Sequence, residues 1–363
     1  MDIAIIGLAQ SGKTTVFNAL TQGTAQAIGS AGGVSETHIG VVKVPDPRLG
    51  VMAGIFNPKK VTPAEIKYWD IPGAVHDGKS QGITGRHRNV LQAANAFLLV
   101  VRAFENPSVP HPQVTIDPAR DLETMLSEIF FADLEVMERA VERLPDAIKK
   151  AKPEERPTAT RHLEAVQKVK AGLEAGIPLR QQQLTESEYS FMVNYQPLTG
   201  KPVIVVFNTD ESDPAFSPDQ LNLAASSMSD LGFVSLSAKL EAELAMMPAE
   251  EAAEFRQDLG LGESALSQVI RASYQTVGLV SFLTVGEDEV RAWSVKKDLP
   301  AQEAAGAIHT DFTRGFIRAE VIPYEDLARC GSLVQGRKEG VLRSEGKTYP
   351  VKDGDVIHFL INV

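Results

Sequence analysis

The residues with the clearest chemical potential form the run GLAQSGKT, from Gly7 to Thr14. The run matches the pattern G-x-x-x-x-G-K-[ST], which binds phosphate chains in nucleotide-binding proteins. Its two glycines let the backbone curl so that successive N–H groups point at an anion. Lys13 would place a positive charge on the β- and γ-phosphates, and the Thr14 hydroxyl would ligate Mg²⁺. The predicted phosphate-binding residues are Gln10, Ser11, Gly12, Lys13, Thr14 and Thr15.

A second element, DIPG from Asp70 to Gly73, follows a predicted strand and matches the D-x-x-G element of P-loop GTPases. In such a site the aspartate holds Mg²⁺, usually through water, and the glycine N–H contacts the γ-phosphate. We therefore predict Lys13, Asp70 and Gly73 as catalytic residues, with Thr14 and Asp70 as the metal ligands. The alternative is that Asp70 is only a turn residue at the end of a strand.

The residue after Gly73 is Ala74, where Ras-like enzymes have the glutamine that orients the attacking water. An alanine cannot do this, so we expect slow intrinsic hydrolysis or a catalytic group supplied from elsewhere. The glycine-rich segment 29–40 occupies the switch position, with Ser35 and Thr37 as candidate Mg²⁺ ligands. Three nearby histidines are expected to be surface residues: His38, His76 and His87.

Base selection is expected at the run NTDE, from Asn208 to Glu211, and at SAK, from Ser237 to Lys239. Guanine-specific proteins carry N-K-x-D, whose aspartate accepts the guanine N1–H and 2-amino group. Here Thr209 replaces the lysine and Glu211 the aspartate, which favours ATP over GTP, or a relaxed choice. An asparagine can bond the N7/N6 edge of either purine. The predicted base-site residues are Asn208, Thr209, Glu211, Ser237, Ala238 and Lys239.

The elements that position these motifs follow from hydrophobic patterning. Apolar runs ahead of glycine-rich loops predict a parallel α/β sheet, in a discontinuous nucleotide-binding domain formed by residues 1–118 and 199–278. An apolar stripe at helical spacing between Leu122 and Leu144, interrupted by Asp133, predicts a long helix within a helical insertion at 119–198. Two strands, a helix and further strands predict a small β-grasp module at 279–363.

Composition limits the functional classes. The 363 residues contain 43% hydrophobic and 23% charged residues, which is typical of a soluble globular protein. No apolar run is long enough to span a membrane, and the chain starts on a predicted strand, so we expect a cytoplasmic protein without a membrane partner. The net charge of −11 disfavours a protein that coats nucleic acid, and no DNA partner is expected. The single cysteine, Cys330, excludes an internal disulfide and a cysteine-based metal site.

Together these motifs resemble the YchF-type Obg-like ATPases, a branch of the Obg family with a Ras-like P-loop GTPase fold. The resemblance covers nearly the whole chain and rests on GLAQSGKTT, GVVKVPDPRL, DIPGAV, ADLE, the N-x-x-E run and SAKLEAEL. The C-terminal stretches EVRAWSV, AAGAIHTDFTRGFIRAEVI and EGKTYPVKDGDVIHF look like the TGS domain of this family. The resemblance implies Mg²⁺-dependent binding and hydrolysis of ATP, and association with ribosomes or ribosomal RNA.

The chain departs from the family pattern at three places in the nucleotide machinery. The family has an asparagine linked to potassium-assisted hydrolysis, so the resemblance implies K⁺ as a further cofactor. In this chain Gln10 stands at that position. Val34 aligns with the switch threonine and has no oxygen ligand, and Pro72 stiffens the D-x-x-G turn. We expect nucleotide binding to survive these changes and efficient hydrolysis to suffer from them.

The sequence therefore favours an ATP-binding, slowly hydrolysing switch protein that contacts the ribosome. One alternative is a nucleotide-gated ribosome or RNA adaptor with negligible turnover. Another is a GTP-specific translational GTPase, which the missing N-K-x-D argues against, and a P-loop small-molecule kinase lacks an evident lid. Basic residues that offer phosphate contacts in the C-terminal module are Arg314, Arg318, Arg337, Lys338 and Arg343.

Overall fold

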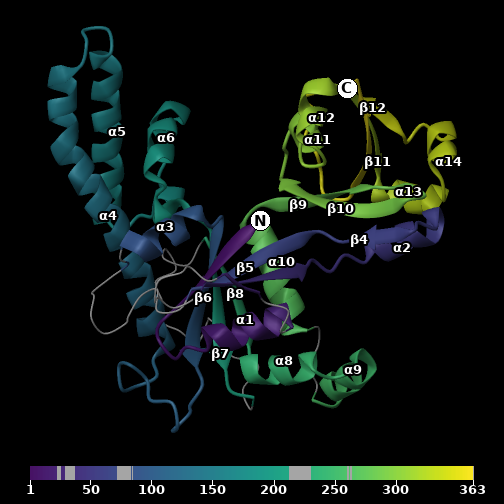
Figure 1. Ribbon diagram of the computed structural model, residues 1–363, viewed down its shortest axis with the longest axis horizontal. Helices are drawn as coiled ribbons and strands as arrows, with labels where there is room; N and C mark the ends of the chain where they lie inside the picture. Colours follow the sequence, from purple (N-terminus) through teal and green to yellow (C-terminus); the bar gives the residue numbers. More distant parts are fainter. Residues whose placement is uncertain are drawn as a thin grey trace. The chain divides into compact units, whose positions relative to one another are not determined.

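The computed structural model describes residues 1–22, 26–28, 37–71, 83, 85–211, 230–259, 261 and 264–362 (Figure 1). The chain forms two compact units. The first unit contains Met1–Gly40 and Lys67–Val269, and the second contains Val41–Ile66 and Ile270–Val363. Among the described residues, no helix is both long and apolar enough to cross a membrane.

The first unit is built on a seven-stranded sheet in the order β2-β3-β5-β1-β6-β7-β8. Five of these strands are parallel: β5, β1, β6, β7 and β8. β1 and β7 are buried along almost their whole length, as expected for parallel strands covered on both faces. The strand bounds are Asp2–Ile6 (β1), Gln26–Ile28 (β2), Thr37–Lys43 (β3), Glu65–Asp70 (β5), Ala96–Ala103 (β6), Val203–Thr209 (β7) and Leu231–Leu236 (β8). The carboxyl ends of the five parallel strands lie at one edge of the sheet.

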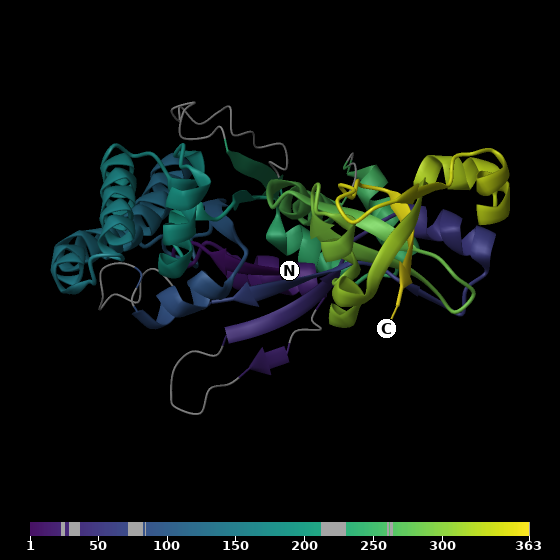
Figure 2. The ribbon, with the colours of Figure 1, turned by 90° about the horizontal axis from the view of Figure 1, so that it is seen from above.

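A helical hairpin extends the first unit, with the short α6 lying beside it in Figures 1 and 2. Its long helices pack along a stripe that includes Met137, Ala140, Val166 and Val169, all fully buried. Asp117 caps the first helix by accepting a hydrogen bond from the Arg120 N–H. The helices of this part are α4 (Pro118–Lys150), α5 (Arg156–Glu174) and α6 (Glu186–Met192). The others that lie in the first unit, or begin in it, are α1 (Lys13–Thr21), α3 (Gly85–Ala93), α8 (Ala238–Ala245), α9 (Ala249–Asp258) and α10 (Ala265–Thr276).

Asp133, the polar member of the α4 stripe, is fully buried and fully bonded. Its carboxylate accepts hydrogen bonds from the Leu198 N–H at 2.9 Å and from the N–H and hydroxyl of Thr199 at 2.7 Å each. Arg88 of α3 pairs with it at 3.2 Å. Burial raises the pKa of Asp133, and these donors oppose the shift. The residue thus fastens α4 to the short 3₁₀ turn before β7 and to α3.

The second unit contains a six-stranded mixed sheet in the order β12-β11-β13-β9-β10-β4. β9 and β10 form an antiparallel hairpin, and β13 lies parallel to β9, an arrangement typical of a β-grasp. The single helix expected after the first two strands of this module is broken into two short helices, α11 and α12. The strands are β4 (Lys60–Thr62), β9 (Leu279–Thr284), β10 (Glu289–Lys296), β11 (Phe316–Pro323), β12 (Arg343–Glu345) and β13 (Asp355–Ile361). The helices are α2 (Arg48–Phe56), α11 (Ala301–Ala305), α12 (Thr310–Gly315), α13 (Tyr324–Cys330) and α14 (Leu333–Lys338). The predicted α/β class, with its inserted helical hairpin, is confirmed.

The observed division differs from the predicted domains chiefly at residues 41–66. It also includes the predicted helical insertion in the first unit and begins the C-terminal part at Ile270 instead of residue 279. Residues 41–66 were assigned to the nucleotide-binding domain, but they group with the C-terminal part of the chain. Two interactions explain this. β4 pairs in parallel with β10, and the Arg48 guanidinium binds both Asp46 and Asp353 at 2.8 Å. The local sequence pattern of this segment does not predict which sheet β4 joins.

Candidate nucleotide-binding site

The loop between β1 and α1 has the backbone of a phosphate cradle. Gly12 has φ +92°, and a Cβ placed there would lie 2.2 Å from the Asn208 amide nitrogen. Only glycine combines this conformation with so close an approach. Gly12 is the N-cap of α1 and no side chain caps the helix. The N–H groups of the first turn of α1 therefore lack helix partners and are available to an anion.

The Lys13 side chain folds back over this loop. Its ammonium donates hydrogen bonds to the carbonyl oxygens of Gly7 at 3.0 Å and Leu8 at 2.8 Å. Burial lowers the pKa of Lys13 to about 8, and the nearby Asp70 carboxylate opposes that shift. A phosphate chain in the loop would give the buried ammonium negative partners in addition to Asp70.

Thr14 and Asp70 meet where the loop faces the end of β5. The Thr14 hydroxyl donates to Asp70 Oδ2 at 2.9 Å, while Oδ1 is buried and has no hydrogen-bond partner among the described residues. A hydroxyl and a carboxylate oxygen are ligands that Mg²⁺ accepts, together with phosphate oxygens and water. No cluster of three or more metal-ligating His, Cys, Asp or Glu occurs in the part of the chain that the structure describes. The two residues thus fit a Mg²⁺ held largely by nucleotide and water.

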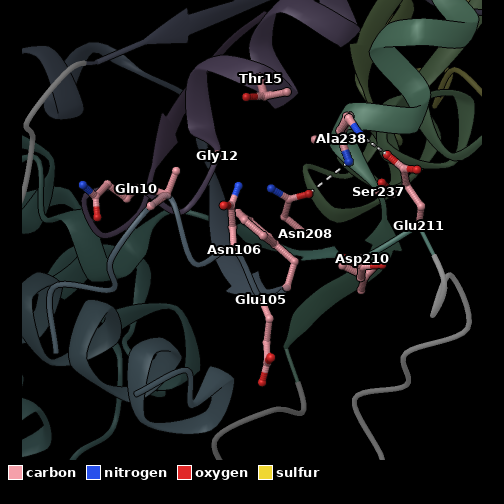
Figure 3. Close-up of a pocket in the computed structure, with 14 residues that line it drawn as sticks. Gln10, Gly12, Thr15, Glu105, Asn106, Asn208, Asp210, Glu211, Ser237 and Ala238 are labelled. Atoms are coloured by element: carbon pink, nitrogen blue, oxygen red, sulfur yellow. Dashed lines mark hydrogen bonds and ion pairs between the residues drawn. The ribbon is translucent and has the colours of Figure 1, made fainter. Parts of the chain in front are cut away.

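A cavity of about 600 Å³ lies beside the loop and brings the predicted phosphate and base residues together (Figure 3). Its volume is in the range of small-molecule sites. Lys13 and Thr14 are not among its lining residues, so the cavity corresponds to the nucleoside side of the site. The predicted residues that line it are Gln10, Gly12, Thr15, Asn208, Thr209, Glu211, Ser237, Ala238 and Lys239.

Asn208 joins three elements of the site rather than presenting a free amide. Its carbonyl accepts a hydrogen bond from the Ala238 N–H at 3.0 Å, as Figure 3 shows. Its NH₂ group donates to the Ser11 carbonyl at 3.1 Å. The Ala238 N–H is therefore already engaged. Asn208 can offer a purine its second amide hydrogen and the remaining lone pair of its carbonyl oxygen.

Glu211 and Lys239 pair with each other at the rim of the cavity. Their charged groups lie 2.9 Å apart, and both side chains are substantially exposed. The hydrogen bond to Glu211 raises the pKa of Lys239. The Glu211 carboxylate is therefore engaged with Lys239 at the rim of the cavity.

Sequence reasoning missed one wall of the cavity. Phe104, Glu105, Asn106 and Val109 line it from the segment that follows β6. In Figure 3 the Glu105 carboxylate points away from the Asn106 amide. This segment matches no nucleotide motif, but it leaves the carboxyl end of a strand beside β1. That position alone could have identified it, because ligands in open α/β sheets bind at this edge.

Several predicted residues lie outside the described part of the chain: Val34, Ser35, Pro72, Gly73, Ala74, Val75 and His76. Of the switch candidates, Thr37 is described and lies in β3, where it pairs with Ile28 of β2. His38 is on the same strand and His87 on α3, and both are half-buried. Gln10 is exposed and has φ +62°, a left-handed backbone that is uncommon for residues other than glycine and asparagine.

Two family models match the chain. One described as "50S ribosome-binding GTPase" matches residues 2–132, and the YchF-type GTPase C-terminal model, described as "Protein of unknown function (DUF933)", matches residues 279–362. Ribosome-binding ATPase YchF of Bacillus subtilis is 37% identical and aligns over 99% of this chain and 98% of its own. YchF of Haemophilus influenzae is 38% identical over the same shares.

A solved structure agrees with these matches. The YchF GTPase of Schizosaccharomyces pombe superposes with a TM-score of 0.84 at 28% identity, covering 99% of this chain and 97% of its own. One family model thus covers the phosphate-binding loop and the other covers the C-terminal module, while the full-length relatives align over both. The chain belongs to the YchF family of P-loop nucleoside triphosphatases.

Proposed function

We propose that this protein is a Mg²⁺-dependent ATP-binding switch that hydrolyses ATP slowly and associates with ribosomes in the cytoplasm. The observation that carries the proposal is the convergence of the glycine-rich loop, Lys13 and the Thr14–Asp70 pair beside a nucleoside-sized cavity. Lys13→Ala should abolish tight nucleotide binding and leave the fold intact, because it removes the charge that faces the β- and γ-phosphates. Wild-type affinity in this variant would contradict the proposal.

The residues of the site divide the work of binding. The N–H groups of the α1 first turn and the Lys13 ammonium bind the phosphates. Thr14 Oγ1 and Asp70 would hold Mg²⁺, which when bound neutralises charge that develops on the transferred phosphoryl group. Asn208 fixes the loop at 237–239 against the phosphate-binding loop. These contacts bind and orient the triphosphate. None of them activates the attacking water.

Base choice follows from Thr209 and Glu211. The chain lacks the lysine and aspartate of N-K-x-D, the pair with which guanine-specific proteins bind the guanine N1–H and 2-amino group. We expect ATP to bind at least as tightly as GTP. The relatives from Bacillus subtilis and Haemophilus influenzae are named ATPases, whereas the one from Schizosaccharomyces pombe is named a GTPase.

Slow hydrolysis is the feature that separates the switch from its alternative. Ala74 and Val34 lack the groups that orient water and ligate Mg²⁺ in related enzymes. Single-turnover hydrolysis of ATP, measured with and without ribosomes, should show a low basal rate and acceleration by the ribosome. No turnover under either condition would favour the nucleotide-gated adaptor. A dependence on K⁺ is tested in the same assay by replacing K⁺ with Na⁺.

Ribosome contact is expected from the second unit, where the five basic residues named from the sequence are all exposed. Arg337 pairs with Glu320 at 2.8 Å and Arg343 lies 3.7 Å from Glu345. Arg314, Arg318 and Lys338 form no ion pair within the described residues. These three cations are thus the ones most available for phosphates of ribosomal RNA.

The structure changes how this contact should be tested. Deleting the chain after Gly278 would strip β4 and Arg48 of their partners, so a truncation could unfold residues 41–66. Arg314→Glu with Arg318→Glu is a better variant, and Lys150→Glu with Arg161→Glu on the helical hairpin is its matched control. Only the first pair should reduce co-sedimentation with ribosomes, and added salt should reduce it in the wild type. The reverse pattern would place the contact on the hairpin.

A further inference from the structure

The wall that follows β6 is held in place by a buried arginine. Arg102, near the end of β6, is 2% exposed. Its Nε donates to the Phe104 carbonyl at 3.1 Å and its Nη2 to the Asn106 carbonyl at 3.4 Å. Its guanidinium also lies over the Phe104 ring, 4.5 Å from the ring centre. The Arg102 side chain thus holds the backbone of two wall residues, Phe104 and Asn106.

The far end of the wall is anchored by a second buried group. His111 Nε2 lies 2.7 Å from Asp121 Oδ2, and both side chains are almost completely buried. Arg120 contacts the other oxygen of Asp121 at 2.9 Å. Between the anchors, the Asn106 side chain accepts a hydrogen bond from the Ser108 N–H at 3.0 Å. The segment from Phe104 to His111 is therefore a clamped loop rather than a free one.

Arg102 itself is not satisfied by the protein. Its Nη1 is buried and has no hydrogen-bond partner among the described residues. Burial lowers the pKa of Arg102, while the charge of Asp121 opposes the shift. Placing an incompletely paired guanidinium in such surroundings costs free energy that a neutral side chain would avoid. This costly guanidinium is the group that hydrogen-bonds the residues of one cavity wall.

We propose that Arg102 is a positioning residue that sets affinity for the nucleoside end of the nucleotide through Phe104 and Asn106. The inference rests on the proposed nucleotide site. It concerns the nucleoside end because the wall lines the cavity that excludes Lys13 and Thr14. A nucleotide buries its base against a surface that Arg102 has already ordered, so binding need not order the loop.

The test compares a ligand that has a nucleoside with one that has none. Calorimetry would measure ATP and inorganic tripolyphosphate, each with Mg²⁺, on the full chain. Arg102→Met removes the donors and keeps a similar stem, whereas Arg102→Lys keeps the charge but cannot reach both carbonyls in the fork geometry of arginine. We expect ATP to bind roughly tenfold more weakly to Arg102→Met than to the wild type. Arg102→Lys should lose less ATP affinity than Arg102→Met. Tripolyphosphate should bind both variants as it binds the wild type.

Arg180→Met is the matched control, because Arg180 is a largely buried arginine that pairs with Asp230 and does not line the cavity. It should change neither affinity. Unchanged ATP binding in Arg102→Met, or an equal loss for both ligands, would overturn the inference. If Arg102→Met does not fold, the ratio of the two affinities in Arg102→Lys decides in the same way. Failure of wild-type protein to bind either ligand would instead refute the nucleotide site itself.

Discussion

The lowered pKa of Lys13 predicts that ATP affinity depends on pH in a range where the nucleotide itself no longer titrates. In the free protein, burial holds the pKa of Lys13 at about 8. A bound triphosphate supplies negative charge within contact distance, which favours the charged ammonium and returns the pKa to its ordinary value or above. Above pH 8, ATP binding must therefore take up a proton.

The magnitude follows from this linkage. If the pKa is about 8 in the free protein and above 10 in the complex, the dissociation constant rises with the fraction of neutral Lys13 in the free protein. Between pH 7.5 and pH 9.5 this amounts to roughly 25-fold weaker binding, or about 2 kcal/mol. The hydrogen bonds from the ammonium to Gly7 and Leu8 belong to the nucleotide-free protein. They do not change the direction in which the dissociation constant varies with pH.

Calorimetric titration of ATP at fixed free Mg²⁺ across this range measures the effect, and two buffers of different ionisation enthalpy report the proton uptake. Lys13→Met should bind weakly at every pH and show no slope. A flat profile in the wild type, or the same slope in Lys13→Met, would refute the reasoning.

Stability should change in the opposite direction. The pKa of Lys13 is lower in the folded protein than its ordinary value of 10.5 in the unfolded chain. The unfolded state therefore binds more protons between about pH 8 and pH 10.5, and folding stability gains up to about 3 kcal/mol from this group as pH rises through that window. Urea unfolding of wild type and Lys13→Met at pH 8 and pH 10 should show this gain in the wild type alone. An equal change in both proteins would contradict the assigned pKa.

Four further variants test other parts of the account. Gln10→Asn should raise the free energy of unfolding by about 0.5 kcal/mol in urea titration, because asparagine tolerates the left-handed backbone better. Asp133→Ala should lower it by about 3 kcal/mol, since Arg88 and the donors at the 3₁₀ turn lose their acceptor. Asn208→Ala should weaken ATP binding on the order of tenfold in calorimetry, because it unlinks the two loops. Thr209→Lys with Glu211→Asp should shift the ratio of ATP to GTP affinity toward GTP; an unchanged ratio would contradict the argument on base choice.

The phosphate-binding part of the site could be predicted from sequence because its chemistry is local. The spacing from Gly7 to Thr14 dictates a strand, a loop and a helix, and that is how β1 and α1 are arranged. Asp70 was predicted by its place after an apolar strand, and it lies 2.9 Å from the Thr14 hydroxyl. The helical hairpin was equally accessible, because its apolar stripe spans many turns.

Features that depend on distant pairing could not be predicted. Residues 41–66 join the second unit through β4 and Arg48, and neither the strand pattern nor the arginine names a partner so far along the chain. The role of Asn208 as a link likewise depends on the positions of Ser11 and Ala238 in space. The wall at Phe104–Val109 matches no nucleotide motif, and its place beside the phosphate-binding loop depends on β6 lying next to β1 in the sheet.

The most direct test of the central claim is a calorimetric titration of the full-length protein with ATP and with GTP, each in the presence of Mg²⁺. We predict binding at one site per chain, with ATP at least as tight as GTP and with affinity that is lost on removal of Mg²⁺. Absence of ATP binding, or a strong preference for GTP, would contradict the account.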